Sequence, residues 1–233
     1  WYGEAEQLLT KWGYDLEWQK SHAIGGELLE EKFEGYVFAE GPWLSTYEIG
    51  AWHSNELYYG EYFNQNNGYV YLTMRPLQAL SYVLYADYGS RIDYSNARLG
   101  DGVDIINSVS WDVNQHLQLE LNHNYSELEV DNQHVYELQQ WDLRMYYKFN
   151  INSMLKVIWQ FEDTDRNQQA YLYRHVNKRE REFGSQVVYS YMINPQSVFY
   201  LGYSDSGYQD DNLEEIERTD RTFFTKISYA WQL

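Results

Sequence analysis

The sequence predicts an all-β chain that forms an antiparallel transmembrane β-barrel of roughly 12 to 14 strands. Three observations predict it: apolar and polar side chains alternate, aromatic residues are abundant, and short turns alternate with longer polar links. Alternation with a period of two places one set of side chains on each face of a strand. A barrel strand needs this pattern because one face meets hydrocarbon and the other a polar lumen.

Composition narrows the class of protein. The chain has 233 residues, a length that one all-β domain can use. It contains no cysteine, which excludes a disulfide framework, a thiol nucleophile and a thiolate metal site. Its formal net charge of −18 argues against a nucleic-acid partner, because phosphate binding needs clustered lysine and arginine. Aromatic residues make up 18% of the chain, an excess typical of membrane-interface girdles.

Hydropathy alone would class the chain as soluble, since its mean hydropathy is −0.68 and no apolar run is long enough for a transmembrane helix. Barrel strands escape such a scan because half of their residues face a polar lumen. The chain begins at Trp1 without an initiator Met or a signal-peptide pattern. We therefore expect a processed chain or a piece of a longer one, which leaves an N-terminally truncated barrel open. One barrel domain is expected over 1–233.

The first part of that domain, 1–42, is poorly defined. Strands can form over 11–20 and 33–40, and the segment 21–32 between them can be a loop or a short helix. The strand pattern there is too irregular to settle the number of strands.

A rhythm of strands and turns begins at residue 43. A strand over 43–53 is followed by a turn at 54–56, and a strand over 57–64 by an Asn- and Gly-rich hairpin turn at 64–68. The next strand is expected to end at Arg75-Pro76, because proline cannot donate to a ladder.

The middle of the chain alternates most regularly. Strands are predicted over 77–88, 103–113, 116–126 and 140–150. In the last of these, one face carries Trp141, Leu143, Met145, Tyr147 and Phe149.

Further strands are predicted over 155–161, 187–193, 199–203 and 219–233, which brings the count to twelve or thirteen. The last strand resembles the assembly signal that the bacterial barrel-insertion machinery reads. Lys226 takes its polar position, Ser228 stands where that signal prefers glycine, and Trp231 and Leu233 take the two terminal hydrophobic positions. The resemblance implies the barrel-assembly machinery as a partner.

Loop lengths sort the strand ends into two sides. Short turns are predicted at 54–56, 75–77, 113–115, 150–153 and 194–196, and longer links at 89–101, 128–135, 163–182 and 205–218. Bacterial outer-membrane barrels have short periplasmic turns and longer outside loops, so the C-terminus is expected on the periplasmic side.

Aromatic residues of the apolar faces gather near the strand ends, as expected for one girdle at each membrane interface. The girdle near the short turns is predicted from Trp111, Tyr147, Phe149, Tyr189, Tyr191, Tyr229 and Trp231. The girdle toward the long links is predicted from Tyr125, Trp141, Phe161, Tyr203 and Phe223.

Four motifs together resemble one bacterial family. They are YGSRIDYSNARLGD (88–101), HLQLELNHN (116–124), YSYMINPQSVFYLGYSD (189–205) and TDRTFFTKISYAWQL (219–233). The chain resembles the C-terminal domain of unknown function in proteins whose N-terminal part is a carbohydrate-binding, family-nine-like β-sandwich. The resemblance covers roughly residues 70–233 and implies an outer-membrane barrel in proteins often labelled hydrolases or carbohydrate-binding proteins. Carbohydrate would be a partner only through the sandwich, which this sequence does not contain.

No motif for catalysis, cofactor binding or metal binding stands out. The segment from Asp163 to Asn167 opens like a calcium loop, but Gln168 stands where glycine is needed and Arg174 where the bidentate Glu belongs. The histidines lack HExxH spacing, no serine has a GxSxG context, and there is no GxGxxG. We therefore expect no catalytic residue, no cofactor and no metal.

Charged residues on the polar faces are predicted to line the lumen. They are Glu120, Asp142, Arg144, Lys148, Lys156, Glu162 and Lys226. Their mixed signs fit cross-strand ion pairs that stiffen the wall, or a polar conduit for a charged or sugar-like solute. The structural interpretation is favoured, because mixed charge does not define a permeant. Outside the barrel, an acidic link over 205–217 and a basic link over 166–181 can pair with each other.

These observations predict a non-enzymatic domain of the bacterial outer membrane, in contact with its lipid and lipopolysaccharide. We expect it to anchor a carbohydrate-binding module or to act as a conduit for it. The alternatives are a free-standing porin for sugar-like or charged solutes, and a soluble β-rich carbohydrate-binding or hydrolase domain. A second sheet or helices over Trp141, Leu143, Met145 and Phe149 would exclude the membrane interpretation.

Overall fold

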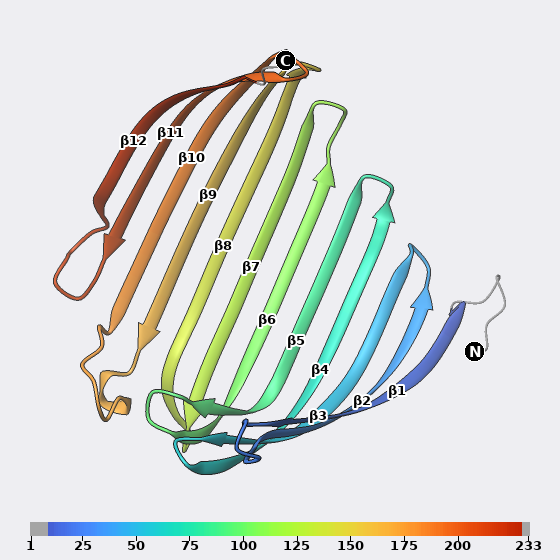
Figure 1. Cartoon of the computed structure of the whole chain (residues 1–233), viewed down its shortest axis with the longest axis vertical. Coiled ribbons are helices and arrows are strands. Elements are labelled where there is room, and N and C mark those ends of the chain that lie inside the picture. Colours follow the sequence, from blue (N-terminus) through green and yellow to red (C-terminus); the bar gives the residue numbers. More distant parts are fainter. Residues whose placement is uncertain (1–8, 230–233) are drawn as a thin grey trace.

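In the computed structural model, which describes residues 9–229, the chain forms one antiparallel sheet of twelve strands (Figure 1). The strands are β1 (Lys11–His22), β2 (Leu28–Gly41), β3 (Ser45–Tyr58), β4 (Glu61–Leu77), β5 (Leu80–Asp93), β6 (Arg98–Asp112), β7 (Leu117–Val130), β8 (Gln133–Asn150), β9 (Ser153–Arg166), β10 (Arg179–Asn194), β11 (Ser197–Gln209) and β12 (Glu217–Tyr229). A single 3-10 turn, η1 (Gln168–Ala170), follows β9. The prediction of an all-β antiparallel chain is confirmed, and the strand number agrees with it.

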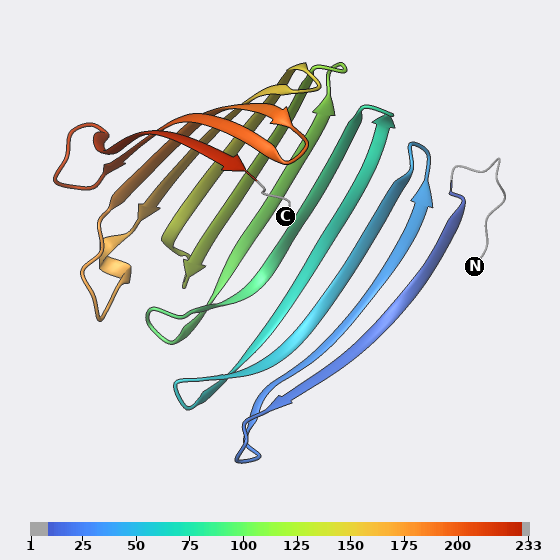
Figure 2. The ribbon, with the colours of Figure 1, turned by 45° about the horizontal axis from the view of Figure 1, so that its top comes forward.

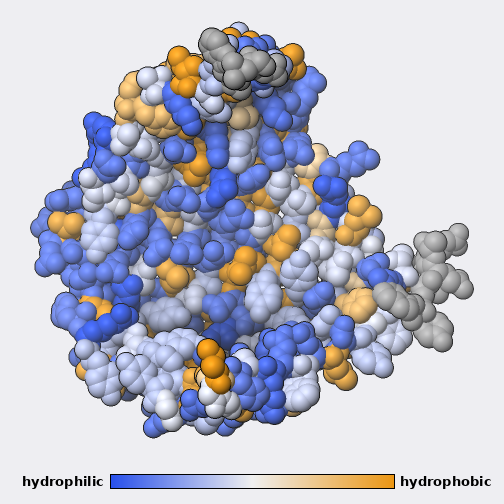
Figure 3. Space-filling view, in the orientation of Figure 1, coloured by the Kyte–Doolittle hydropathy of each residue, from blue (hydrophilic) through white to orange (hydrophobic). Residues whose placement is uncertain are grey.

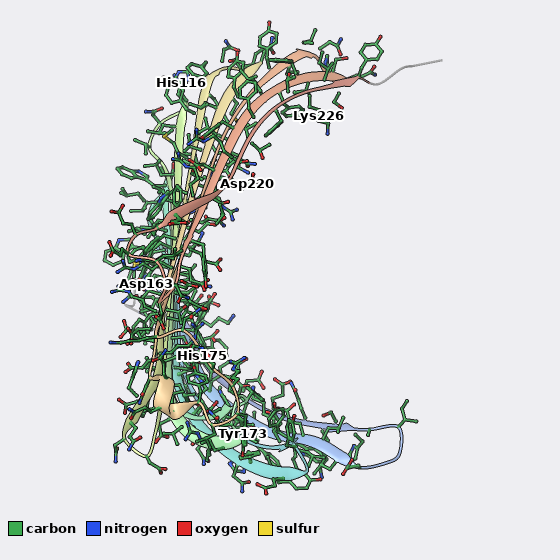
Figure 4. The ribbon with its side chains drawn as sticks, turned by 90° about the vertical axis from the view of Figure 1, so that its left-hand side faces the viewer. His116, Asp163, Tyr173, His175, Asp220 and Lys226 are labelled. Atoms are coloured by element: carbon green, nitrogen blue, oxygen red, sulfur yellow. The ribbon has the colours of Figure 1, made fainter. Side chains whose placement is uncertain are left out.

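Each strand pairs with its neighbours in the chain, so the order in the sheet is the order in the sequence (Figure 2). The sheet is strongly curved: seen from the side it forms a C, with β1 toward one tip and β12 toward the other (Figure 4). Over residues 9–229 these two edge strands do not pair with each other. The described sheet is therefore an open, curved wall and not a closed barrel.

Two of the five two-residue hairpin turns in the described chain share one backbone geometry. Tyr59 and Gly60 join β3 to β4, and Asp131 and Asn132 join β7 to β8. All four residues have positive φ, between 52° and 82°. Two consecutive residues with positive φ give the turn whose twist matches the right-handed twist of paired strands. These hairpins therefore form without a longer loop.

The strands between residues 45 and 77 differ from the prediction. The turn expected at 54–56 lies inside β3, and the Asn-rich segment 64–68 lies inside β4. Asn64, Asn66 and Asn67 pair in register with Asn55, His53 and Trp52 of β3. Ladder pairing with β3 along the whole segment, and with β5 from Asn67 onward, satisfies the backbone there, so the local turn preference of Asn-Gly is overridden.

The longer links were also predicted too long. The link predicted at 89–101 is a turn at 94–97, and the link predicted at 128–135 is a turn at 131–132. The other two links remain long loops, at 167–178 and 210–216. The four short turns expected from residue 75 onward are confirmed within about two residues, at 78–79, 113–116, 151–152 and 195–196.

The strands continue past the apolar part of the sheet, which explains this difference. On β9, Phe161 is followed on the same face by Asp163 and Asp165. Asp163 accepts bonds from Arg179 at 2.6 Å and from Arg181 at 3.1 Å. Backbone pairing does not require apolar side chains, so the ladder extends through a segment that is polar on both faces.

The sheet has little buried core. Among the described residues, one cluster of buried apolar side chains lies at the loop end of β7 and β8, made of Leu128, Val130, Val135 and Ala170. The described part of the chain contains no helix that is long and apolar enough to span a bilayer.

Candidate functional site

Register separates two faces that stay continuous across the whole sheet. On β8, for example, Asp142 faces the same side as Asn122 on β7 and Gln160 on β9, whereas Leu143 shares the other side with Leu121 and Trp159. The polar set lies on the concave side of the C, where Figure 4 places Asp220 and Lys226. Figure 3 looks into this side and shows a hollowed surface of mostly hydrophilic colour with scattered hydrophobic residues.

The convex face carries large apolar side chains in contact with solvent. Val37, Ile49 and Phe223 are 55%, 69% and 70% exposed. The accessible surface of the chain is 15528 Å². A compact protein of its mass, 28.0 kDa, would have about 11,000 Å². A single sheet without a covering layer accounts for the excess, and no second sheet or helix covers Leu143 or Phe149 in the described part of the chain.

Most of the predicted girdle residues lie on this convex face. Near the short turns, Tyr147 contacts Phe149 at 4.9 Å between ring centroids, and Phe149 contacts Tyr189 at 6.3 Å. Toward the other end, Trp141 pairs in register with Phe161. Register also assigns Trp111, Tyr125, Tyr191, Tyr203, Phe223 and Tyr229 to the convex face. Trp231 lies outside the described residues.

The seven residues predicted to line the lumen share the concave face. Register places Glu120, Asp142, Arg144, Lys148, Lys156, Glu162 and Lys226 there together. Of the predicted assembly signal, Lys226 and Ser228 lie on β12 and face the same side, whereas Trp231 and Leu233 lie outside the described residues.

The predicted cross-strand ion pairs among these seven residues do not form. Arg144 stands opposite Glu120 on β7, but its guanidinium binds Asp142 on its own strand, at 2.8 and 3.0 Å. A two-point contact of the planar guanidinium with one carboxylate is the stronger geometry. Neighbouring amides bind the remaining carboxylates: Gln140 donates to Glu162 at 2.7 Å, and Gln118 to Glu120 at 3.3 Å.

Asp142, Gln140 and Glu162 border a hollow of about 640 Å³ in the C-terminal half of the sheet. Its polar lining comes from β7 to β12 and includes Asn122, Asn124, Gln140, Asp142, Gln160 and Glu162. Amides both donate and accept hydrogen bonds, so this lining can bind hydroxyl groups or hydrated ions. The surface is therefore suited to a polar solute.

The structure contains an ion cluster that was not predicted from the sequence. Arg91 on β5 binds Asp87 on the same strand, Asp104 on β6 at 2.9 Å, and Asn67 on β4 at 2.8 Å. Segment 89–101 was predicted as a link, and β5 in fact continues to Asp93. Asp87 and Arg91 are an even number of positions apart, so alternation along one strand could have placed both on the same face.

Aromatic rings on the concave face lie against glycines of the neighbouring strand. A Cβ added to Gly13 would lie 2.8 Å from the ring of Phe38, and one added to Gly50 would lie 2.5 Å from the ring of Tyr69. Gly202 and the ring of Phe224 form a third such pair. Each glycine is the direct register partner of its aromatic residue. The missing side chain lets the ring lie against the wall, an arrangement known to stabilise strand glycines.

The longest loop, 167–178, folds back onto the sheet. Ala170 is buried against Leu128, Val130 and Val135. Its carbonyl accepts from Asn96 at 3.1 Å, and Asn96 in turn accepts from the N–H of Leu172 at 2.8 Å. Figure 4 places His175 on the concave side of the ribbon. The loop is thus fixed at the rim of the concave face, between β9 and the turn that follows β5.

Asp211 ties the same loop to the acidic loop 210–216. Its carboxylate accepts from the backbone N–H groups of Lys178 at 2.6 Å and Arg179 at 2.9 Å. These two bonds hold the pKa of the Asp211 carboxyl below its ordinary value. The predicted pairing of an acidic with a basic loop is therefore real, but it runs mainly through backbone donors.

Comparison with known proteins adds little to this geometry. No protein-family model matches the sequence, and a search of curated protein sequences finds no match. Among solved structures, the chain is similar to the NanC porin, with 14% sequence identity and a TM-score of 0.35. That match covers 96% of this chain and 100% of the porin. A likeness this distant supports no inference about what the chain transports or binds.

Proposed function

We propose that this chain is a β-barrel domain of the bacterial outer membrane, with its convex face in lipid and lipopolysaccharide and its concave face lining a polar lumen. One observation carries the proposal. The convex face is apolar across twelve strands, and within residues 9–229 no second layer covers it. In water such a surface would be far larger than the apolar patches that soluble monomers expose. In a bilayer it is the normal lipid-facing surface of a barrel.

The domain serves as membrane anchor or conduit for a carbohydrate-binding module, as the family resemblance implies. The resemblance of the last strand to the assembly signal makes the barrel-assembly machinery the route of insertion. The second candidate is a free-standing porin for sugar-like or charged solutes. The hollow of about 640 Å³ and its amide-rich lining favour a conduit over a filled bore.

A barrel in lipid requires that both sheet edges be paired, because unpaired backbone groups are costly in hydrocarbon. β1 and β12 run antiparallel to each other, and each turns its polar side chains to the concave face. Direct pairing of these two strands would close the sheet without breaking either face. We infer that these two edges meet in the membrane.

Extraction and gel mobility test the membrane assignment. A folded barrel needs detergent for extraction and migrates faster on a gel before boiling than after. A chain that stays soluble without detergent and shows no heat-dependent shift contradicts the proposal. Purified protein in planar bilayers then separates the two candidates: a stable open conductance supports the conduit, and a folded barrel without conductance supports the anchor.

Cysteine cross-linking tests the closure, since the native chain has no cysteine. Single cysteines at Glu17 or Gln19 on β1 are combined with cysteines at Lys226 or Ser228 on β12, all on the concave face. At least one combination should form a disulfide within one chain in membranes. The matched control combines Gln19→Cys with Ile227→Cys, which face opposite sides and should stay reduced. No cross-link in any combination would contradict direct closure.

A further inference from the structure

A carboxylate without a basic partner stands within a frame of aromatic rings on the concave face of β2, β3 and β4. Glu48 on β3 pairs in register with Phe38 on β2 and Tyr71 on β4. The next concave position of β3 is Gly50, which pairs with Tyr36 and Tyr69. Direct and diagonal neighbours on one face lie within reach of aromatic side chains. Glu48 is therefore flanked by rings on both sides and at both diagonals.

The charge of Glu48 is not neutralised within the described residues. No lysine or arginine nitrogen of residues 9–229 lies within 4 Å of its carboxylate, whereas the two lysines on the concave face of β1 to β3 bind other carboxylates. Lys11 binds Glu40 at 2.7 Å, and Lys32 binds Glu34 at 2.7 Å. Glu48 is half-buried, so its charge is only partly screened by water.

Ring faces in this region already receive ammonium groups. The Nζ atom of Lys32 lies 5.1 Å from the ring centroid of Trp52, and that of Lys11 lies 5.6 Å from that of Phe38. Both distances are within the range at which a cation is attracted to an aromatic face. Lysine side chains of this wall thus already make cation–π contacts with its aromatic rings.

A hollow of about 240 Å³ lies at this place. It is lined by Glu34, Glu48, Trp52, Tyr69, Tyr71 and Tyr85, with Lys32 at its side. Because Lys32 is already bound to Glu34, Glu48 supplies the remaining charge of the hollow. Its volume suits a small organic cation.

We propose that this hollow binds a small organic ammonium ion, with Glu48 as counter-charge and the surrounding tyrosine and tryptophan rings as the walls of the site. Rings and a carboxylate together recognise a cation with an apolar body, because each ring attracts positive charge and packs against methyl or methylene groups. The inference rests on the proposed function only in that the concave face is the accessible lumen.

Choline and its uncharged carbon isostere, 3,3-dimethylbutan-1-ol, test the site by calorimetric titration of the full chain in detergent. Choline should bind the native chain at least tenfold more tightly than the isostere. Glu48→Gln should weaken choline binding about tenfold, and Tyr71→Leu about threefold. Glu162→Gln, on the concave face of β9, is the matched control and should leave binding unchanged.

Equal binding of choline and its isostere would overturn the proposal, and so would unchanged binding by Glu48→Gln. Heat-dependent gel mobility shows for each variant that the barrel is folded. If a folded barrel binds no choline at concentrations up to about 100 mM, the proposed site is overturned and the barrel proposal remains intact. A chain that is soluble without detergent overturns the barrel proposal, and the same titration on the soluble chain then decides the site.

Discussion

The concave faces of β1 to β3 and of β7 to β9 belong to one sheet but differ in chemistry. The first carries seven carboxylates and two lysines: Asp15, Glu17, Glu30, Glu34, Glu40, Glu48 and Glu56, with Lys11 and Lys32. The second has three carboxylates and four basic residues, Glu120, Asp142, Glu162, Arg144, Lys148, Lys156 and Arg166, among five amides. The convex faces of both regions are apolar. In the proposed barrel, contact with lipid would constrain the convex faces of both regions alike, whereas their concave faces are free to differ.

The N-terminal wall (β1 to β4) and the C-terminal wall (β7 to β12) can also be compared at their concave glycines. On the N-terminal wall, the rings of Phe38 and Tyr69 lie against Gly13 and Gly50. On the C-terminal wall, the ring of Phe224 lies against Gly202 in the same way, but Gly184 has no ring over it, and a Cβ there would meet only the amide oxygen of Gln160 at 3.9 Å. The same strand geometry thus supports an acidic wall and an amide-rich wall of mixed charge. The proposed cation site uses the excess of carboxylates on the first.

The largest effect is expected from a charge on the shared convex face. Ile49→Arg on the N-terminal wall and Leu143→Arg on the C-terminal wall should each destabilise the folded barrel by about 2–4 kcal/mol, because arginine is placed in hydrocarbon. Urea unfolding in lipid vesicles measures this free energy.

The control for that pair is Gln160→Arg. Gln160 lies on the concave face of β9, the strand next to that of Leu143. It should change the free energy of unfolding by less than about 1 kcal/mol, because the lumen is polar. If Ile49→Arg were tolerated and Leu143→Arg were not, the N-terminal wall would not face lipid, and the two walls would not belong to one barrel.

A smaller, local effect is expected at the loop that covers the rim of the C-terminal wall. Asn96→Ala removes the side-chain bonds to the carboxylate of Asp93, the carbonyl of Ala170 and the N–H of Leu172. Arg98 still donates to the first two, so the N–H of Leu172 is the group that loses its partner, and the variant should cost about 1–3 kcal/mol because Asn96 is buried. Hydrogen exchange across 167–178 should accelerate, with the strands unaffected. The exposed Asn64, which makes no side-chain hydrogen bond within the described chain, provides Asn64→Ala as control.

Gly50 on the N-terminal wall and Gly184 on the C-terminal wall allow a glycine under a ring to be compared directly with one that has no ring over it. Gly50→Ala should destabilise the barrel by about 1 kcal/mol, because its Cβ would overlap the ring of Tyr69. Gly184→Ala should stabilise it by about 0.5 kcal/mol, because a strand glycine is replaced where there is room. Urea unfolding of both variants in the same vesicles compares them. Equal effects would mean that the ring does not lie against Gly50.

The smallest effect concerns pH and the loops of the C-terminal wall. The pKa of Asp211 lies below its ordinary value of 3.8 because the charged form accepts two backbone bonds. The contact should therefore be complete above pH 3.8 and be lost as the pH falls through the lowered pKa. The amide proton shifts of Lys178 and Arg179, followed by NMR, should titrate together with a midpoint below 3.8. A midpoint at or above that value would show that the bonds do not form.

The sequence was sufficient for what depends on alternation. The face of each residue from Trp141 to Phe149, the convex aromatic girdle and the concave charged set follow from period two alone. Strand limits were less accessible. Segments 64–68 and 89–93 have the composition of turns, yet ladder pairing with β3 and with β6, respectively, holds them extended.

The side-chain partners on neighbouring strands also could not be predicted from the sequence. The choice of Arg144 for Asp142 over Glu120 depends on guanidinium geometry and not on register. The frame around Glu48 requires knowing that Phe38 and Tyr71 stand opposite it, and that register was hidden by the misplaced turns at 54–56 and 64–68. A correct hairpin assignment at Tyr59-Gly60 would have revealed it.

The neighbour-only pairing of the sheet has an evolutionary consequence. Because each described strand pairs only with its neighbours in the chain, and only the proposed closure would join distant strands, duplication or deletion of an internal hairpin leaves the other described strand pairs unchanged. The width of such a wall can therefore vary in steps of two strands by simple gene rearrangement. Each added hairpin brings its own concave side chains, so a new selectivity can be acquired without altering the convex face already in place.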